Sequence, residues 1–471
     1  MKFEKDIKVI EVYDVVVCGG GPSGCAAALA ARREGLNVLL VESMGQLGGM
    51  AVSGHVSHWL GGRTQEGEWI VGGLFRSLAV EAAEKGYAAI PFLEPEKEYH
   101  PYGWFNWFVH GIPLDPFSID LFLDKKMEEA GIDVLLHTQF IEPIINGNRI
   151  THVVLYNAGG LFAVPVTAVI DATGNADVAY RSGCETIKGR KEDGLMAPTS
   201  LIFHVYNVDT EELTAAVEEN RDPKFRDLIG RLRKEGVWPY PYDIFICTQL
   251  PQKGEFYINT CRLTGIDGTD GKSLSEGMRR GRKETHELMR IFREYFPGFK
   301  NARIKSIASQ LGVRETRRIV GNFVLTVEDL RKNKSFDDNI GFSMYGWDLP
   351  DPNKPSIQPF AEDEKSGFRP KVEKGLSTPL PYRIMIPRPI ENLICPGRAV
   401  SVEGQVLGPV RVMAPCMAMG EAAGMASRQV VKEQVGFAGI NMDNLRNHLK
   451  KAGAIIDTEQ LPPIYPRIDQ I

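Results

Sequence analysis

The feature that most limits how this chain can fold is a glycine pattern between two apolar runs, "YDVVVCGGGPSGCAAALAARREGLNVLLVE", residues 13–42. A β-branched run that ends in glycine is typical of a buried parallel strand. The alanine-rich stretch that begins at Pro22 favours a helix, and Gly35 stops it. The second apolar run favours another buried strand. Together these signals predict a β-α-β unit.

Three glycines stand where the first strand turns into the helix. Gly19 permits the tight turn, Gly21 lets the backbone approach a pyrophosphate, and Gly24 lets the helix pack on the strands. Free amides at the helix N-terminus would stabilise the phosphates. Glu42 ends the second strand, where a carboxylate accepts ribose hydroxyls. The context predicts an adenine dinucleotide site, and the alternative is a purely structural turn.

The next segment, "SMGQLGGMAVSGHVSHWLGG" (43–62), is rich in glycine. A nicotinamide dehydrogenase would instead continue into another helix and strand of its half-sheet. The segment therefore favours a backbone that wraps closely around a large planar cofactor.

Composition excludes several classes of partner. A net charge of −5 over 471 residues offers no basic field for nucleic acid. No window approaches the ~18 uncharged apolar residues of a membrane helix, and the first residues lack a secretion signal. We therefore expect a cytoplasmic protein. The seven cysteines are scattered and odd in number, which predicts reduced packing residues and no metal site.

Further motifs add a resemblance. They are "VIDATGNADVA" (169–179), "GVRETRRIVG" (312–321), "NLICPGRAVS" (392–401) and "GPVRVMAPCMAMGEAAG" (408–424). With the glycine pattern and "LGGM", they resemble the FAD-dependent oxidoreductase family of the glutathione-reductase-like flavoproteins. Succinate dehydrogenase and fumarate reductase flavoproteins are more distant relatives. The resemblance covers nearly the whole chain in order and implies FAD as the cofactor.

This resemblance implies an α/β fold in which a discontinuous, Rossmann-like FAD-binding domain carries an inserted α+β substrate domain. The cofactor motifs lie near the start, near 170 and near 400. We therefore assign 1–75, 112–190 and 379–471 to the FAD domain and 191–378 to the substrate domain. The polar, proline-rich stretch near 349–376 is expected to be an exposed loop or lid.

The predicted FAD contacts follow from the β-α-β pattern and from the resemblance. They are Gly19, Gly21, Pro22, Ser23, Gly24, Glu42, Ser43, Gly48, Gly49, Met50, Ala172, Thr173, Gly174, Gly397, Arg398, Arg411 and Val412. Small residues in the late helix would equally allow close helix packing. Asp177 suits a helix cap as well as a binding role.

The flavin carries the hydride chemistry, so the chain must supply an acid or base. His55 is the first candidate, together with His58, because histidine titrates near neutral pH and both follow "LGGM". A structural role is the alternative, and neither stands in the motif that binds FAD covalently in succinate dehydrogenase relatives.

Arg314 is the second catalytic candidate, together with Arg317 and Arg318. An arginine can clamp a substrate carboxylate, and the fumarate reductase relatives use one as a proton donor. The alternative is a polar helical face on which these arginines pair with Glu315 or Glu328.

The aromatic stretch 99–111 could line a pocket, fill the core or contact a second copy of the chain. No second Gly-x-Gly-x-x-Gly follows a strand, and no paired redox cysteines occur. Electrons must therefore pass to or from the substrate, oxygen, a quinone or another protein. The expected function is an FAD-dependent oxidoreductase that moves a hydride between a small organic substrate and the flavin. A catalytically silent flavin-binding or sensing protein is the alternative.

Overall fold

The computed structural model describes residues 4–64, 66–91, 111–353 and 377–462. The helices are α1 (Pro22–Arg33), α2 (Gly73–Glu84), α3 (Pro116–Ala130), α4 (Asp177–Arg181), α5 (Thr210–Asn220), α6 (Arg226–Lys234), α7 (Gly271–Tyr295), α8 (Val327–Arg331), α9 (Leu407–Val410), α10 (Met413–Lys432) and α11 (Met442–Lys451). The strands are β1 (Lys8–Val9), β2 (Tyr13–Cys18), β3 (Val38–Val41), β4 (His58–Trp59), β5 (Ile112–Pro113), β6 (Asp133–Leu135), β7 (Gln139–Asn146), β8 (Arg149–Asn157), β9 (Gly160–Asp171), β10 (Thr186–Lys188), β11 (Phe203–Tyr206), β12 (Cys247–Gln249), β13 (Phe256–Ile258), β14 (Arg303–Ile307), β15 (Arg317–Ile319), β16 (Asn339–Ser343), β17 (Thr378–Pro381) and β18 (Leu393–Ile394).

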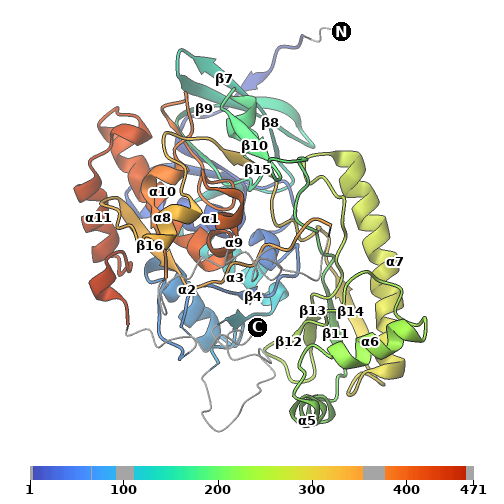
Figure 1. Ribbon diagram of the computed structural model, residues 1–471. Coiled ribbons are helices and arrows are strands. Elements are labelled where there is room, and N and C mark those ends of the chain that lie inside the picture. Colours follow the sequence, from blue (N-terminus) through green and yellow to red (C-terminus); the bar gives the residue numbers. More distant parts are fainter. Residues whose placement is uncertain (1–3, 65, 92–110, 354–376, 463–471) are drawn as a thin grey trace.

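The larger sheet has the strand order β6-β3-β2-β9-β8-β7, and β1 and β18 also pair with β9. Strands β6, β3, β2 and β18 form parallel pairs with their neighbours, whereas β7, β8 and β9 form an antiparallel meander. Strand β9 therefore begins in the meander at the top of Figure 1 and ends inside the parallel sheet. The predicted β-α-β unit is present as β2, α1 and β3, which is the Rossmann-like arrangement.

Helices α1 and α10 pack directly on each other against the parallel strands. A Cβ atom at Gly420 would lie 2.1 Å from the backbone oxygen of Ser23, and one at Gly424 would lie 2.3 Å from that of Ala27. Only glycine fits at these two positions, because any side chain would push the helices apart. The small residues of α10 therefore do serve close packing.

A second body follows β10. Its antiparallel sheet has the order β12-β13-β11-β14, and α5, α6 and the long α7 lie around it at the right of Figure 1. It has its own hydrophobic core, which includes Phe203, Phe245 and Phe292. The prediction assigned residues 325–340 to the substrate domain (191–378), but buried residues of this stretch pack in the core around α1 and α10. Leu325, for example, packs in this core, and its backbone nitrogen donates to the backbone oxygen of Ser401 at 3.1 Å. Strand β16 also contacts α10 and pairs with β17.

Two predicted features lie outside the described residues. They are the aromatic stretch up to residue 110 and most of the loop near 349–376.

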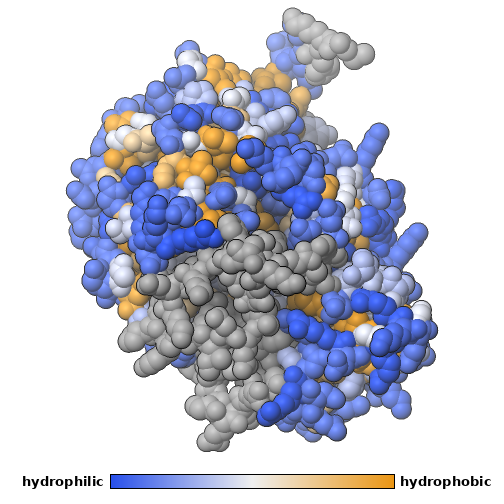
Figure 2. Space-filling view, in the orientation of Figure 1, coloured by the Kyte–Doolittle hydropathy of each residue, from blue (hydrophilic) through white to orange (hydrophobic). Residues whose placement is uncertain are grey.

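All seven cysteines are buried and free. Within the described ranges, no helix has the length and apolar character needed to cross a bilayer. Figure 2 shows that hydrophilic residues cover most of the described surface over α7.

The contact between α1 and α10 predicts a matched pair of glycine substitutions. Gly424→Val should lower the free energy of unfolding by about 1–3 kcal/mol or prevent folding, because the new side chain collides with backbone. Gly230→Ala, within α6, meets nothing within 4 Å and should be neutral or stabilising by roughly 0.5–1 kcal/mol. Urea unfolding measures both. Equal effects of the two substitutions would contradict this account of the contact.

Glu421 in α10 predicts a pH dependence of stability. One carboxylate oxygen accepts a hydrogen bond from the backbone nitrogen of Leu74 at 3.0 Å, the other has no partner among the described residues, and burial raises the pKa to about 7. A carboxyl whose pKa is raised on folding stabilises the protein below its unfolded pKa, and this contribution is lost as pH rises through 7. Wild-type protein should therefore lose on the order of 2 kcal/mol between pH 5 and pH 8 relative to Glu421→Gln. Parallel pH profiles of the two proteins in urea unfolding would contradict the assignment.

Candidate active site

The glycines after β2 form a cradle that side chains would fill. Gly19 has φ +108°, and a Cβ atom there would lie 2.4 Å from the backbone oxygen of Ala172. A Cβ at Gly24 would lie 1.8 Å from the oxygen of Gly19. Gly21 caps the N-terminus of α1 and lines a cavity at this point. The first turn of α1 therefore presents its free amides to the cavity, as a phosphate site requires.

Glu42, directly after β3, is buried beside this cradle. Its carboxylate accepts hydrogen bonds from the backbone nitrogens of Gly20 and Met44, both at 2.7 Å, and from the hydroxyl of Ser43 at 3.0 Å. These bonds hold the carboxylate at the cavity wall. An acceptor at this point suits the hydroxyls of a ribose.

The turn after β9 forms a second wall. The buried Asp171 carboxylate accepts hydrogen bonds from the hydroxyl of Thr173 at 2.6 Å and from the backbone nitrogen of Ala179 at 3.0 Å. Burial raises the pKa of Asp171 to about 6. Asp177 is the first residue of α4 rather than its cap, and it forms an ion pair with Arg317 at 3.1 Å.

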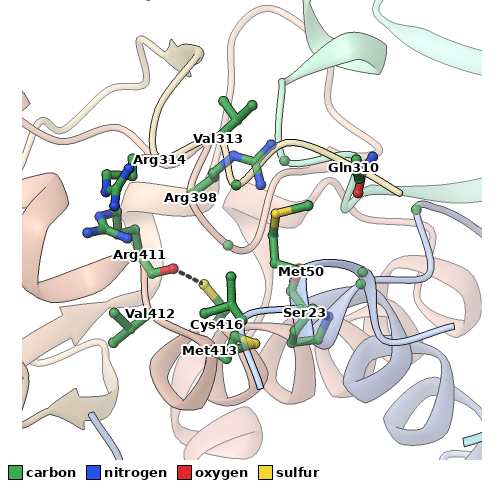
Figure 3. A pocket seen from close by; sticks show the side chains of 18 of the residues that line it. Ser23, Met50, Gln310, Val313, Arg314, Arg398, Arg411, Val412, Met413 and Cys416 are labelled. Carbon is green, nitrogen blue, oxygen red and sulfur yellow. Dashed lines mark hydrogen bonds between the residues drawn. The ribbon is translucent and has the colours of Figure 1, made fainter. Parts of the chain in front are cut away.

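A third wall comes from the turn after β18 and from the start of α10. Gly397 has φ +101°, and Arg398 donates to the side-chain oxygen of Asn175 at 2.9 Å. The thiol of Cys416 donates to the backbone oxygen of Arg411 at 3.2 Å, the dashed line in Figure 3. Burial raises the pKa of this thiol to about 12, so it is not a nucleophile at neutral pH.

The structure brings the predicted FAD contacts together. All of them except Gly24 and Gly48 line a single cavity of about 540 Å³. The cavity suits FAD, because its phosphate end is a glycine cradle and its walls carry buried guanidinium nitrogens, Nε of Arg398 and Nε of Arg411, that have no hydrogen-bond partner among the described residues. When bound, FAD would supply the hydride acceptor or donor.

The same cavity extends to the sheet of the second body, where Arg314 lies. Arg314 donates through Nη1 to the backbone oxygen of Pro198 and through Nη2 to the hydroxyl of Ser200. Burial and the nearby charges of Arg262 and Arg411 hold its pKa well below the ordinary value. Figure 3 shows Arg314 and Arg411 together at one end of the cavity.

The other two arginines of the motif lie elsewhere. Arg317 and Arg318 belong to β15, which pairs with β10, so the motif forms no helical face. Arg318 pairs with Glu315 at 3.2 Å, one of the two partners that the ion-pair interpretation named. Of the three arginines, Arg314 is the one that lines the cavity.

The two histidines after "LGGM" have different positions. His58 lines the cavity, where its Nδ1 lies 3.3 Å from the Tyr257 hydroxyl and burial lowers its pKa to about 3. His55 is not among the lining residues. Its ring stacks on His204 at a centroid distance of 4.3 Å, and its Nδ1 lies 2.8 Å from the backbone oxygen of Val52. The predicted catalytic role of His55 stays a prediction.

Sequence reasoning assigned no role to several residues that line this end of the cavity, among them Ser200, Lys224, Tyr257, Arg262 and Asp348. Burial lowers the pKa of Lys224 to about 8. These residues come from four separate segments, so no local motif marks them. Arg262 alone carried a signal, since it is a charged residue soon after the apolar strand β13.

Comparisons with known proteins agree with this geometry. A family model of FAD dependent oxidoreductases matches residues 14–449. Over 51 residues the chain is 49% identical to a thioredoxin reductase of Ureaplasma parvum, which is 11% of this chain and only 16% of that protein. An uncharacterized protein from the nifH2 5′ region of Methanosarcina barkeri is 27% identical over 192 residues, 40% of this chain and 96% of that protein.

Flavin-dependent enzymes are among the solved structures that match this chain. The p-nitrophenol 4-monooxygenase of Pseudomonas putida has a TM-score of 0.45 at 13% identity, over 94% of this chain and 84% of that chain. The myxobacterial chondrochloren halogenase has a TM-score of 0.47 at 13% identity, over 94% of this chain and 79% of that chain.

The family model covers the glycine cradle, the turn after β9 and the start of α10, the three walls of one dinucleotide cavity. The chain therefore belongs to the FAD-dependent oxidoreductase family, and its cofactor is FAD.

Proposed function

We propose that this enzyme transfers a hydride between FAD and a small organic substrate that binds at the end of the cavity formed by the second body. The observation that carries the proposal is the continuity of the cavity. Its lining passes from Gly21 and Gly49 at the cradle to Tyr257 and Arg314 on the second body. Substrate pockets favour such boundaries between two packed bodies.

Arg314 is the residue that we expect to contact the substrate. Its guanidinium is buried, and the hydrogen bonds to Pro198 and Ser200 fix its orientation. Such a group positions a substrate without reorganising when the reaction occurs.

His58 and Tyr257 would form the opposite polar wall. The pKa of His58, lowered to about 3, keeps its imidazole neutral at pH 7, so it would act by hydrogen bonding rather than by charge. Apolar neighbours at this end of the cavity, Ile202, Ile244 and Ile246, would exclude water from the reacting carbon. A catalytically silent flavoprotein would have no need of this arrangement.

The first test compares Arg314→Lys with His55→Ala, both loaded with FAD. The lysine keeps the charge but loses the planar fork, so anaerobic reduction of the flavin should slow by about 10²–10³-fold, as for other positioned donors. His55→Ala tests the other predicted catalytic residue, which does not line the cavity, and a rate within a few-fold of wild type would remove His55 from the catalytic residues. The measurement is bleaching of flavin absorbance with a panel of hydroxy acids, amino acids and alcohols. Reduction by dithionite but by no compound of the panel would favour the silent alternative.

The second test concerns the FAD site. Glu42→Ala removes a carboxylate acceptor, and hydrogen bonds to charged groups contribute about 1.5–3 kcal/mol, so the Kd for FAD should rise at least 10-fold. Glu218→Ala, on the exposed side of α5, is the control and should leave it unchanged. Fluorescence titration of the apoprotein with FAD measures both. An unchanged Kd for Glu42→Ala would remove Glu42 from the site.

A further inference from the structure

The geometry points to a carboxylate-bearing substrate, recognised jointly by Arg262, Arg314 and Ser200 at the end of the cavity away from the glycine cradle. This inference rests on the proposed function, because it names the chemical class of the molecule that would bind there. The proposed function leaves the substrate open, whereas this inference says that the substrate carries a carboxylate.

Three arginines converge at this end of the cavity. Arg262 and Arg314 have exposed fractions of 6% and 9%, and the side chain of Arg411 has 14%. The charge of Asp348 acts on the pKa of Arg262. The charges of Arg262 and Asp348 both act on the pKa of Arg314. The charge of Arg411 also acts on Arg398.

These charges are not balanced by the described residues. Asp348 lies 3.5 Å from Arg411 and is its ion-pair partner. Arg262 and Arg314 form no ion pair with a described carboxylate, and their hydrogen bonds go to neutral oxygens. Arg262 and Arg314 therefore bring two positive charges without an ion-pair partner among the described residues into a region of low exposure. Buried charges are stable only when an opposite charge or hydrogen bonds compensate them, so the site favours an anion.

Ser200 determines the shape of this anion site. Its hydroxyl oxygen accepts from Arg262 Nη1 and from Arg314 Nη2, both at 2.9 Å. A hydroxyl oxygen has two lone pairs and one hydrogen, so the hydrogen remains to be donated. Ser200 lines the cavity between the two guanidiniums. Nε of the buried Arg262 also has no hydrogen-bond partner among the described residues. Planar guanidiniums and one hydroxyl suit the planar, two-oxygen geometry of a carboxylate.

The test is a titration of the oxidised holoenzyme with benzoate and with its neutral isostere benzamide, followed by the absorbance of the bound flavin. Acetate and acetamide provide a smaller pair, and inorganic phosphate provides a tetrahedral anion. We expect a carboxylate to bind at least 10-fold more tightly than its amide and than phosphate. Arg262→Gln and Arg314→Gln should each raise the Kd of the carboxylate at least 10-fold, and Arg262→Lys less.

Arg290→Gln is the control, because Arg290 lies exposed on α7 and pairs with Glu294. It should leave every Kd unchanged. Equal binding of carboxylate and amide, or tighter binding of phosphate, would overturn the inference. A lower flavin reduction potential in Arg262→Gln with unchanged carboxylate affinity would assign the cluster to the flavin alone and overturn it as well.

Failure here and failure of the proposed function give different results. Carboxylate binding without flavin reduction by any compound would contradict hydride transfer and support the anion site. Flavin reduction by neutral alcohols without carboxylate binding would overturn the anion site alone.

Discussion

The contact on which the site depends is the close packing of α1 against α10. Gly420 and Gly424 let the backbone of α10 contact the backbone of α1 at Ser23 and Ala27. No side chain separates the two helices at these points. As a result, Ser23 in the first turn of α1 and Met413 in the first turn of α10 both line the cavity. A phosphate end and a flavin end can then belong to one ligand.

Strand β9 connects this packing to the rest of the enzyme. Its start belongs to the antiparallel meander and its end pairs with both β2 and β18. The turn after β9 and the turn after β18 therefore emerge at the same edge of the sheet, where carboxyl ends of parallel strands place ligand sites. Gly174 and Gly397, more than 200 residues apart in the sequence, therefore line one cavity because β18 pairs with β9.

Local signals explain what the sequence could predict. The β2-α1-β3 unit is encoded within 13–42 by apolar runs and glycines, and the same kind of strand-and-turn signal marks Gly174 and Gly397. Contacts between distant segments carried no such signal. The core position of Leu325, the stacking of His55 on His204 and the meeting of Arg262 with Arg314 at Ser200 all depend on how separate segments pack. The finer expectation of a glutathione-reductase-like enzyme stays a prediction.

The arginine cluster of Arg262, Arg314 and Arg411 combines charges from both packed bodies. Arg411 lies between α9 and α10, whereas Arg262 follows β13 in the sheet of the second body. The two bodies together bury these like charges, which repel each other in a region of low dielectric constant. Hydrogen bonds to Ser200, Pro198 and Asn259 hold the guanidiniums in place before any ligand arrives. The positive charges at this boundary are therefore preorganised.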